Sequence, residues 1–412
     1  MTNFTDRVRE ARSRFETLCA EPVSLDITRG KPSAEQLDLS QEILTILGPD
    51  DFKDGRGNDC RNYGVPDGLP EVRALFGDLL DVPADGIVLG DNSSLSLMAD
   101  ALGAAVSHGV PGGSVPWGSA DAQLLCPVPG YDRHFGLTQH LGVGMTNVAI
   151  GVEGLDIESV QRLAASDERV KGIWLVPKYQ NPVGYTLAPD EVRALATMKT
   201  AAPDFRILWD NAYVVHHIDE ALDPVANVLQ ACAEAGNPDR AWIFGSTSKI
   251  TFAGAGVSAF GGSEANVAWF RKQRGVRTIG PDKVNQLRHL RFFGDADGVR
   301  AHMRRHASLL RPKFEVVQRV LETHLGGSDF ASWTQPRGGY FVSLDTQAGR
   351  ARRVFDAAAR AGVALTPVGA TFPHGDDPED RNIRIAPTLP PLPELEQAMA
   401  ILATAILCES SD

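Results

Sequence analysis

Two residues at the rim of a predicted sheet could carry out chemistry together. Asp210 follows the apolar run 206–209, and Lys249 comes shortly after a second apolar run that ends at Phe244. Taken alone, the aspartate is explained as a helix N-cap and the lysine as a solvated surface residue. Together they indicate more specific chemistry, because a lysine amine forms a Schiff base with an aldehyde and a buried aspartate keeps a pyridine nitrogen protonated. The pair therefore predicts pyridoxal 5'-phosphate as a cofactor.

Hydroxyl groups and a helix N-terminus could hold the phosphate of this cofactor. The segment Asn92-Ser93-Ser94 follows the apolar run 87–89 and begins a stretch of helical periodicity, while Ser246 and Ser248 precede Lys249. Ordinary helix capping is the alternative explanation for the serines and the asparagine. All five residues stand after predicted strands, as a phosphate site would require.

Four more polar or aromatic side chains match the remaining needs of the reaction. Tyr131 offers a flat face for ring stacking, and Asn181 and Tyr213 offer donors to the ring oxygen. Arg384, between two isoleucines of a predicted strand, could bind a substrate carboxylate through two parallel hydrogen bonds. The alternatives are turn residues for Tyr131 and Asn181 and an exposed strand arginine for Arg384. The order of the set along the chain makes it specific.

Near-continuous apolar runs between residues 85 and 265 predict the sheet that positions these groups. Such runs are typical of strands buried on both faces in a largely parallel sheet that helices cover, which makes a doubly wound α/β domain. Ligands bind beyond the carboxyl ends of such strands. The predicted strands are 87–89, 124–126, 172–176, 206–209, 241–244 and 258–260.

A second, smaller α+β domain is predicted from the rest of the chain. It contains one long helix at 296–325 and strands at 339–344 and 382–385, and a helix near 3–20 joins it. The predicted division is a large cofactor-binding domain of residues 46–295 and a discontinuous small domain of residues 1–45 and 296–412.

Composition excludes several classes of protein. The 412 residues carry 40 basic and 52 acidic side chains, a net charge of −12, so no basic face for nucleic acid is expected. No apolar run is long enough for a transmembrane helix, and the first residues lack the apolar core of a signal peptide. The five cysteines are odd in number and lack C-x-x-C spacing, which favours a reducing cytoplasm.

These motifs resemble, over essentially the whole chain, the fold-type I pyridoxal-phosphate aminotransferases of the aspartate aminotransferase superfamily. The branch most similar to the chain is that of the MocR-like (actinobacterial-type) aspartate aminotransferases. The resemblance is carried by Gly30, Asn62-Tyr63-Gly64, Asn92-Ser93-Ser94, Tyr131, Asn181-Pro182, Asp210-x-x-Tyr213, Ser246-x-Ser248-Lys249 and Arg384.

The resemblance implies a role for each of these residues. Lys249 would be the Schiff-base lysine and the general base, and Asp210 would pair with the pyridine nitrogen. Arg384 would bind the α-carboxylate beside Gly30. Tyr63 would reach the site from a second subunit, which implies a homodimer with its site at the subunit boundary. Many relatives carry an arginine for the phosphate where this chain has Val257.

The expected reaction is a ping-pong transfer of an amino group between an L-amino acid and a 2-oxo acid. Arg29, Lys31 or Lys178 could bind a distal carboxylate, which favours aspartate and 2-oxoglutarate as substrates. A β-lyase or decarboxylase would use the same cofactor residues, although Arg384 speaks against loss of the carboxylate that it would bind. A cofactor-binding regulatory protein is a further alternative, but there is little room for a DNA-binding domain before residue 25.

Other motifs predict less. Lys178 could carry the aldehyde instead of Lys249, but it lacks flanking serines. The pattern G-x-G-x-x-A at 254–259 would need a helix after it to bind a dinucleotide, and no G-x-S-x-G elbow of a serine hydrolase is present. His302 and His306 have spacing for a metal ion, but the arginines between them favour a solvated helix face.

Overall fold

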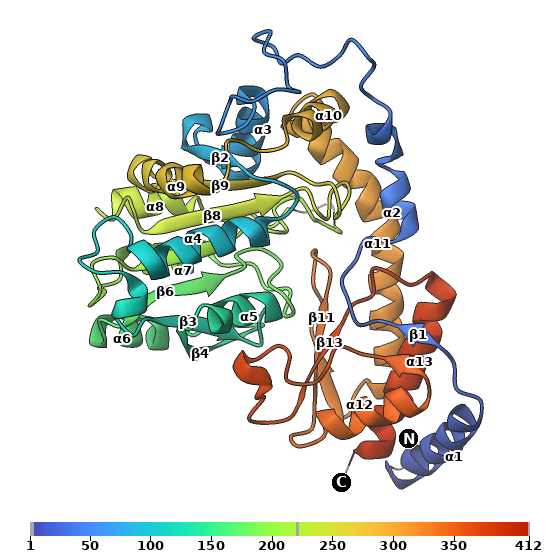
Figure 1. The fold of residues 1–412 in the computed structure, drawn as a ribbon. Helices are drawn as coiled ribbons and strands as arrows, with labels where there is room; N and C mark the ends of the chain where they lie inside the picture. Colours follow the sequence, from blue (N-terminus) through green and yellow to red (C-terminus); the bar gives the residue numbers. More distant parts are fainter. Residues whose placement is uncertain (1–3, 220–221, 411–412) are drawn as a thin grey trace.

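The computed structural model describes residues 4–219 and 222–410 and contains one large sheet beside a smaller body of helices and strands (Figure 1). The large sheet has eight strands in the order β2-β9-β8-β7-β6-β3-β4-β5. Their bounds are β2 Ile87–Leu89, β3 Gln123–Val128, β4 Gly144–Gly151, β5 Gly154–Leu155, β6 Val170–Leu175, β7 Arg206–Asp210, β8 Ala241–Ser246 and β9 Ser258–Gly262.

The sheet is largely parallel, as predicted. The pairs β8–β7, β7–β6, β6–β3 and β3–β4 are parallel, whereas β9 runs antiparallel to both of its neighbours and β5 antiparallel to β4. The carboxyl ends of the central strands point toward the smaller body (Figure 1). Side chains that follow these strands therefore meet in the region between the two parts.

Successive strand residues face opposite layers of helices, because side chains alternate along a strand. In β7, Leu208 packs into the core under α4 (Ser94–His108), α5 (Asp132–His140) and α9 (Glu264–Arg277). Ile207 and Trp209 pack into the core of the other face. The helices on that face are α3 (Pro70–Leu80), α6 (Ile157–Ser166), α7 (Pro189–Thr197), α8 (Val228–Glu234) and α10 (Lys283–Phe293).

The smaller body has its own core around an antiparallel sheet of order β10-β11-β13. The strands are β10 (Ala331–Trp333), β11 (Val342–Thr346) and β13 (Asn382–Ile385), and the helices are α12 (Ala351–Arg360) and α13 (Leu392–Glu409). N-terminal elements pack here as well: α1 (Phe4–Ala20) lies against α13, and β1 (Leu25–Asp26) pairs with β12 (Val363–Ala364). A short helix, α2 (Ala34–Asp38), contacts the long helix α11 (Ala296–Leu325).

One helix joins the two parts of the molecule. The helix α11 spans Ala296–Leu325, the bounds predicted from the sequence, and contains Pro312. Val299 and Met303 on its first half pack into the core of the large sheet. Its second half, from Leu310 to Leu325, packs into the core of the smaller body.

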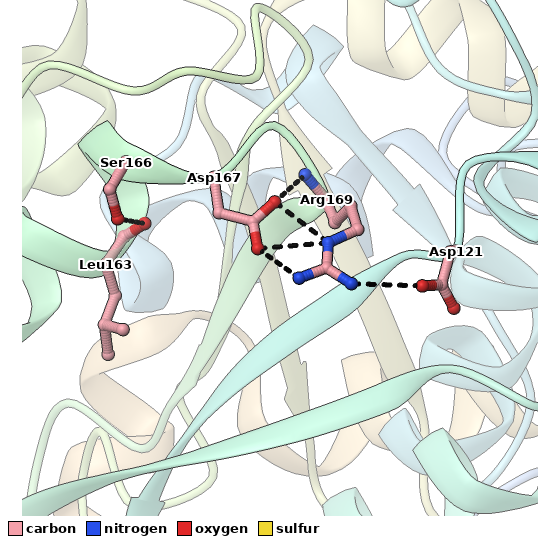
Figure 2. Close-up of polar contacts among 5 residues, drawn as sticks. All are labelled: Asp121, Leu163, Ser166, Asp167 and Arg169. Carbon is pink, nitrogen blue, oxygen red and sulfur yellow. Dashed lines mark hydrogen bonds and ion pairs between the residues drawn. The ribbon is translucent and has the colours of Figure 1, made fainter.

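A cluster of charged side chains lies at the opposite edge of the large sheet, where β6 begins. Figure 2 shows Arg169 between Asp167, at 2.8 Å, and Asp121, at 3.3 Å. Asp167 ends α6, and its side chain is 31% exposed. Such surface ion pairs contribute little to stability. Within the described residues, no helix is long and apolar enough to cross a membrane.

Candidate active site

A cavity of about 130 Å³ lies beyond the carboxyl ends of β6, β7 and β8. It brings most of the predicted cofactor residues together, with apolar side chains of α4 between them. The lining residues are Ser93, Ser94, Leu95, Met98, Tyr131, Val176, Asn181, Asp210, Ala212, Tyr213, Ser246, Ser248 and Lys249.

Asp210 is buried at the end of β7, and only one of its two oxygens has a partner. Its Oδ2 lies 3.0 Å from Nε2 of His134. Its Oδ1 is buried and has no hydrogen-bond partner. An unpartnered buried carboxylate oxygen carries a substantial free-energy penalty, and this one belongs to a residue that lines the cavity. The oxygen is therefore available to an N–H group of a bound ligand.

His134 holds Asp210 in place, and the sequence analysis missed it. The imidazole stacks on the indole of Trp174, with ring centroids 4.2 Å apart and planes at 9°. It also meets the edge of Tyr131, which precedes it by three residues at the start of α5. That spacing places both side chains on one face of the helix, and it was the available signal. The stacked ring fixes the orientation of the carboxylate.

Lys249 lines the cavity in the turn after β8 and lies close to Tyr213. Its Nζ is 4.9 Å from the centroid of the Tyr213 ring. Burial lowers the pKa of the lysine, and the nearby Asp210 carboxylate partly opposes that effect. A lowered pKa increases the fraction of neutral amine near pH 7, which is the form that can act as a nucleophile or a base.

The two tyrosines of the cavity remain protonated. Burial raises the pKa of Tyr213 well above its usual value, and the neighbouring Tyr131 and Asp210 add to that effect. Burial likewise raises the pKa of Tyr131. Both phenols are therefore hydrogen-bond donors at neutral pH.

Serine hydroxyls and the N-terminus of α4 surround one end of the cavity. The side chain of Ser93 caps α4 by accepting a hydrogen bond from the Leu95 amide. Ser248 donates to the carbonyl of Asn92 at 2.8 Å, and Ser246 lies 3.0 Å from Ser248. The helix N-terminus and these hydroxyls form an anion site. Asn92 contributes to this network but does not line the cavity.

Val257 is apolar and supplies no cation for a phosphate. Its side chain is 1% exposed and belongs to the hydrophobic core below the lysine turn. Among the residues that line the cavity, Lys249 is the one cation. The residues 254–259 lead into β9 and not into a helix, so the dinucleotide motif lacks the element that it requires.

Arg384 lies on β13 beside the cavity, and its guanidinium is 6% exposed. Its Nη1 contacts Oδ1 of Asn181 at 3.4 Å and Oδ1 of Asp132 at 2.9 Å. Its Nε is buried without a partner. Phe341 packs under the guanidinium, with the Cζ atom of Arg384 4.9 Å from the centroid of the Phe341 ring. The Phe341 ring also lies against Gly30. A Cβ at position 30 would lie 2.5 Å from that ring, which explains the glycine.

Comparison with known proteins decides the family. The family model described as aspartate amino-transferase matches residues 1–412. The chain belongs to the aspartate aminotransferase family. A Corynebacterium glutamicum aspartate aminotransferase is 46% identical, with 98% of this chain and 93% of the relative covered. A Mycolicibacterium smegmatis protein named as an aminotransferase is 51% identical, with 97% and 94% covered.

Solved structures of aminotransferases have the same fold. An aspartate transaminase from Corynebacterium glutamicum superposes with a TM-score of 0.95 at 46% identity, over 98% of this chain and 95% of that chain. An α-aminoadipate aminotransferase from Thermus thermophilus, complexed with N-(5'-phosphopyridoxyl)-L-leucine, has a TM-score of 0.75 at 18% identity over 96% of both chains. The second likeness shows the fold alone. The chain is therefore an aminotransferase of fold type I.

Several predicted residues of this aminotransferase lie away from the cavity. Tyr63 is 80% exposed and lines a separate surface hollow together with Ile279 and Gly280. Arg29 and Lys31 are exposed. Lys178 is buried near Asp81 and Asp223 and does not line the cavity, and burial lowers its pKa to about 8.

The prediction of a solvated face for His302 and His306 was wrong. Both side chains are buried, at 5% and 0% exposed, because the apolar stripe of α11 includes their face. Their Nε2 atoms lie 3.0 Å apart, and His302 donates to the carbonyl of Ile250, the residue after Lys249. Within the described residues, no group of three or more histidine, cysteine or acidic side chains could hold a metal ion.

The histidines belong to a buried polar chain that ends at Lys249. His306 contacts Gln36, which donates to the hydroxyl of Tyr340 at 2.9 Å. That hydroxyl donates to the backbone carbonyl of Lys249 at 3.3 Å. Groups from α2, α11 and the segment before β11 thus hold two consecutive carbonyls, those of Lys249 and Ile250.

Burial of His306 predicts a loss of stability in mild acid. Burial and the neighbouring His302 lower the pKa of His306 to about 3, whereas the unfolded chain binds a proton near pH 6.5. The stabilising contribution is thus complete above about pH 6.5 and declines as the pH falls toward 3. The free energy of unfolding can be measured in urea at several pH values between 7.5 and 5. We expect its slope with pH to be smaller in His306→Gln, by the amount that corresponds to about one proton fewer bound on unfolding.

The control is His108→Gln, at an exposed histidine near the end of α4. This variant should keep the full pH dependence of the wild type. An unchanged slope in His306→Gln would show that the buried histidine does not contribute to acid sensitivity.

Proposed function

We propose that this aminotransferase binds pyridoxal 5'-phosphate in the cavity and transfers the amino group of L-aspartate to 2-oxoglutarate. One observation carries the proposal: a single cavity is lined by Lys249, by hydroxyls at a helix N-terminus and by Asp210, whose Oδ1 is buried without a partner. A pyridine N–H, an aldehyde and a phosphate are the groups that this set of side chains fits.

When bound, the cofactor supplies an aldehyde for the amino group and a ring that accepts electrons from the substrate's Cα. The side chains have complementary tasks. The unpartnered oxygen of Asp210 would pair with the ring nitrogen, and His134 would fix the orientation of that carboxylate. Tyr213 and Asn181 would hold the ring oxygen, and Tyr131 would stack on the ring. Lys249 Nζ would take the proton from the substrate's Cα and return it.

The phosphate is assigned to the hydroxyls and to the end of α4. Ser93, Ser94, Ser246 and Ser248 supply donors there, and Asn92 holds the loop through its carbonyl. Because no arginine lines the cavity, the helix N-terminus and the hydroxyls would supply the electrostatic stabilisation of the phosphate.

Aspartate is proposed as the amino donor because the relatives at 46% identity carry that name. A half-reaction screen tests this choice. The cofactor-loaded protein is mixed with single amino acids, and the visible spectrum and the keto acid product are followed. Aspartate and glutamate should shift the spectrum and yield oxaloacetate and 2-oxoglutarate. Release of ammonia or carbon dioxide in place of these products would indicate a lyase or a decarboxylase.

Arg384 is proposed to bind the α-carboxylate, with Gly30 beside it in the pocket. Replacing Arg384 by glutamine should raise KM for aspartate by about 10- to 100-fold, because a charge-assisted bidentate contact is lost. Turnover at saturation should change less. Arg381→Gln, which removes an arginine paired with Glu379 on the same segment, should leave KM unchanged. Equal KM values in both variants would place the carboxylate elsewhere.

We further propose a homodimer in which Tyr63 completes the site of the partner subunit. Tyr63, Val276 and Ile279 are exposed at 80%, 91% and 65%, and such apolar exposure is typical of an interface. Light scattering should give the mass of a dimer. A cytoplasmic location is proposed as well, because the five cysteines are unpaired.

A further inference from the structure

The guanidinium of Arg384 is already held by a carboxylate of its own chain. Asp132 is the first residue of α5, directly after Tyr131, and its Oδ1 accepts a hydrogen bond from Arg384 Nη1 at 2.9 Å. The two residues come from different parts of the molecule, the large sheet's helical layer and β13 of the smaller body. The pair therefore links the two parts of the molecule beside Asn181, which lines the cavity.

The two partners differ in their freedom to move. The Arg384 side chain is 6% exposed and is fixed by Phe341 and Asn181. The Asp132 side chain is 33% exposed and lies in the first turn of α5. The helix dipole stabilises a carboxylate there, also when the side chain changes its rotamer. Asp132 can thus turn to solvent at little penalty, while the arginine keeps its place.

A substrate carboxylate competes with Asp132 for the same N–H groups. The Nη1 group of Arg384 donates to Asp132, and the Nε group of Arg384 has no hydrogen-bond partner. A bidentate contact needs two N–H groups in parallel, and two carboxylates at one guanidinium repel each other. An incoming carboxylate must therefore displace Asp132 or bind beside it against its charge.

We propose that Asp132 is a built-in competitor for Arg384 that sets the affinity threshold for carboxylic acids. An acid that binds only through one carboxylate gains little when it displaces Asp132. An acid that also binds through its amine or a distal carboxylate has the additional free energy to displace it. Such a competitor raises KM without slowing the chemical steps, because it opposes ground state and transition state alike. This inference rests on the proposed function of Arg384.

The test is Asp132→Asn, which removes the charge and keeps an oxygen that can accept from Arg384. Maleate, a dicarboxylate without an amine, is titrated into the cofactor-loaded protein by calorimetry, and KM and kcat are measured for aspartate. We expect maleate to bind about 5- to 20-fold more tightly, KM to fall to a similar degree, and kcat to stay within about 2-fold of wild type.

Asp167→Asn is the matched control. Asp167 has nearly the same exposure, 31%, and is also paired with an arginine, but it lies at the opposite edge of the sheet (Figure 2). This variant should leave maleate binding and KM unchanged. Asp132→Ser, which also removes the negative charge at the first residue of α5, should reproduce the tighter binding if the asparagine variant folds poorly.

The opposite result would overturn the inference. If Asp132→Asn weakens maleate binding and raises KM, Asp132 positions Arg384 and does not compete with substrate. Unchanged binding would show that the carboxylate site lies elsewhere. Failure of the proposed function has a different signature: the wild-type protein would then give no spectral change with any amino acid, whatever the effect of Asp132 on maleate.

Discussion

Replacing Lys249 by alanine should lower the turnover of aspartate by about 10⁴-fold or more, because in the proposed function one amine both carries the cofactor and moves the substrate proton. Lys249 lines the cavity, and burial lowers its pKa, which favours the neutral form that these tasks need. The variant is assayed with aspartate and 2-oxoglutarate at saturating concentration. Its stability should not fall, because the loss of a buried amine removes a desolvation penalty.

Lys178→Ala provides the control, because Lys178 also follows a strand, is buried, and has a pKa lowered to about 8. It does not line the cavity, so its replacement should leave turnover within a few-fold of wild type. Borohydride reduction followed by tryptic digestion adds a direct measurement. The cofactor should be found on the peptide that contains Lys249. A cofactor on the Lys178 peptide would contradict the assignment and reverse the roles of the two lysines.

Replacing Asp210 by alanine should lower kcat by about 10²- to 10⁴-fold, the range observed when a single electrostatic or proton-transfer contribution is removed. The carboxylate has one oxygen held by His134 and one oxygen without a partner, which the proposed function assigns to the ring nitrogen. Loss of that charge makes the ring a weaker electron acceptor. The fold should persist, so cofactor content and the thermal midpoint are measured beside kcat.

Asp210→Asn distinguishes charge from shape at this position. The amide fills the same space, so near-normal turnover in Asp210→Asn would show that the negative charge is not required. His134→Phe keeps the stacking on Trp174 and removes the contact with Asp210. It should give a smaller loss of kcat than Asp210→Ala, because the carboxylate remains and loses only its orientation.

The sequence predicted the strands of the large sheet that are buried on both faces, and it missed β4 and β5 at the edge of that sheet. The strand β2 has the predicted bounds, and the other predicted runs lie within or overlap the observed strands. The strand β4 was missed because its residues alternate between buried and exposed near the edge of the sheet. The division of the chain at residues 45 and 295 remains a prediction.

Site residues that directly follow a strand could be predicted from the sequence. Those that lie on the face of a helix were harder to predict. Lys249, Asp210 and Tyr213 follow strands, and the cavity brings them together. His134, which was missed, depends on helical spacing from Tyr131. His302 and His306 were assigned to solvent because of the arginines between them. Those arginines lie on another face of α11. The two histidines are four residues apart and therefore share the buried face that includes Val299 and Met303.

Pro312 is a position at which the helix α11 can bend. A proline inside a helix removes one backbone hydrogen bond and lowers the energy needed to bend the helix there. In α11 it stands where the helix has left one core and entered the other. A swing of the C-terminal half about this point would move β13, and with it Arg384, relative to Asp132 on α5, while His302 kept its contact with the carbonyl of Ile250 next to Lys249.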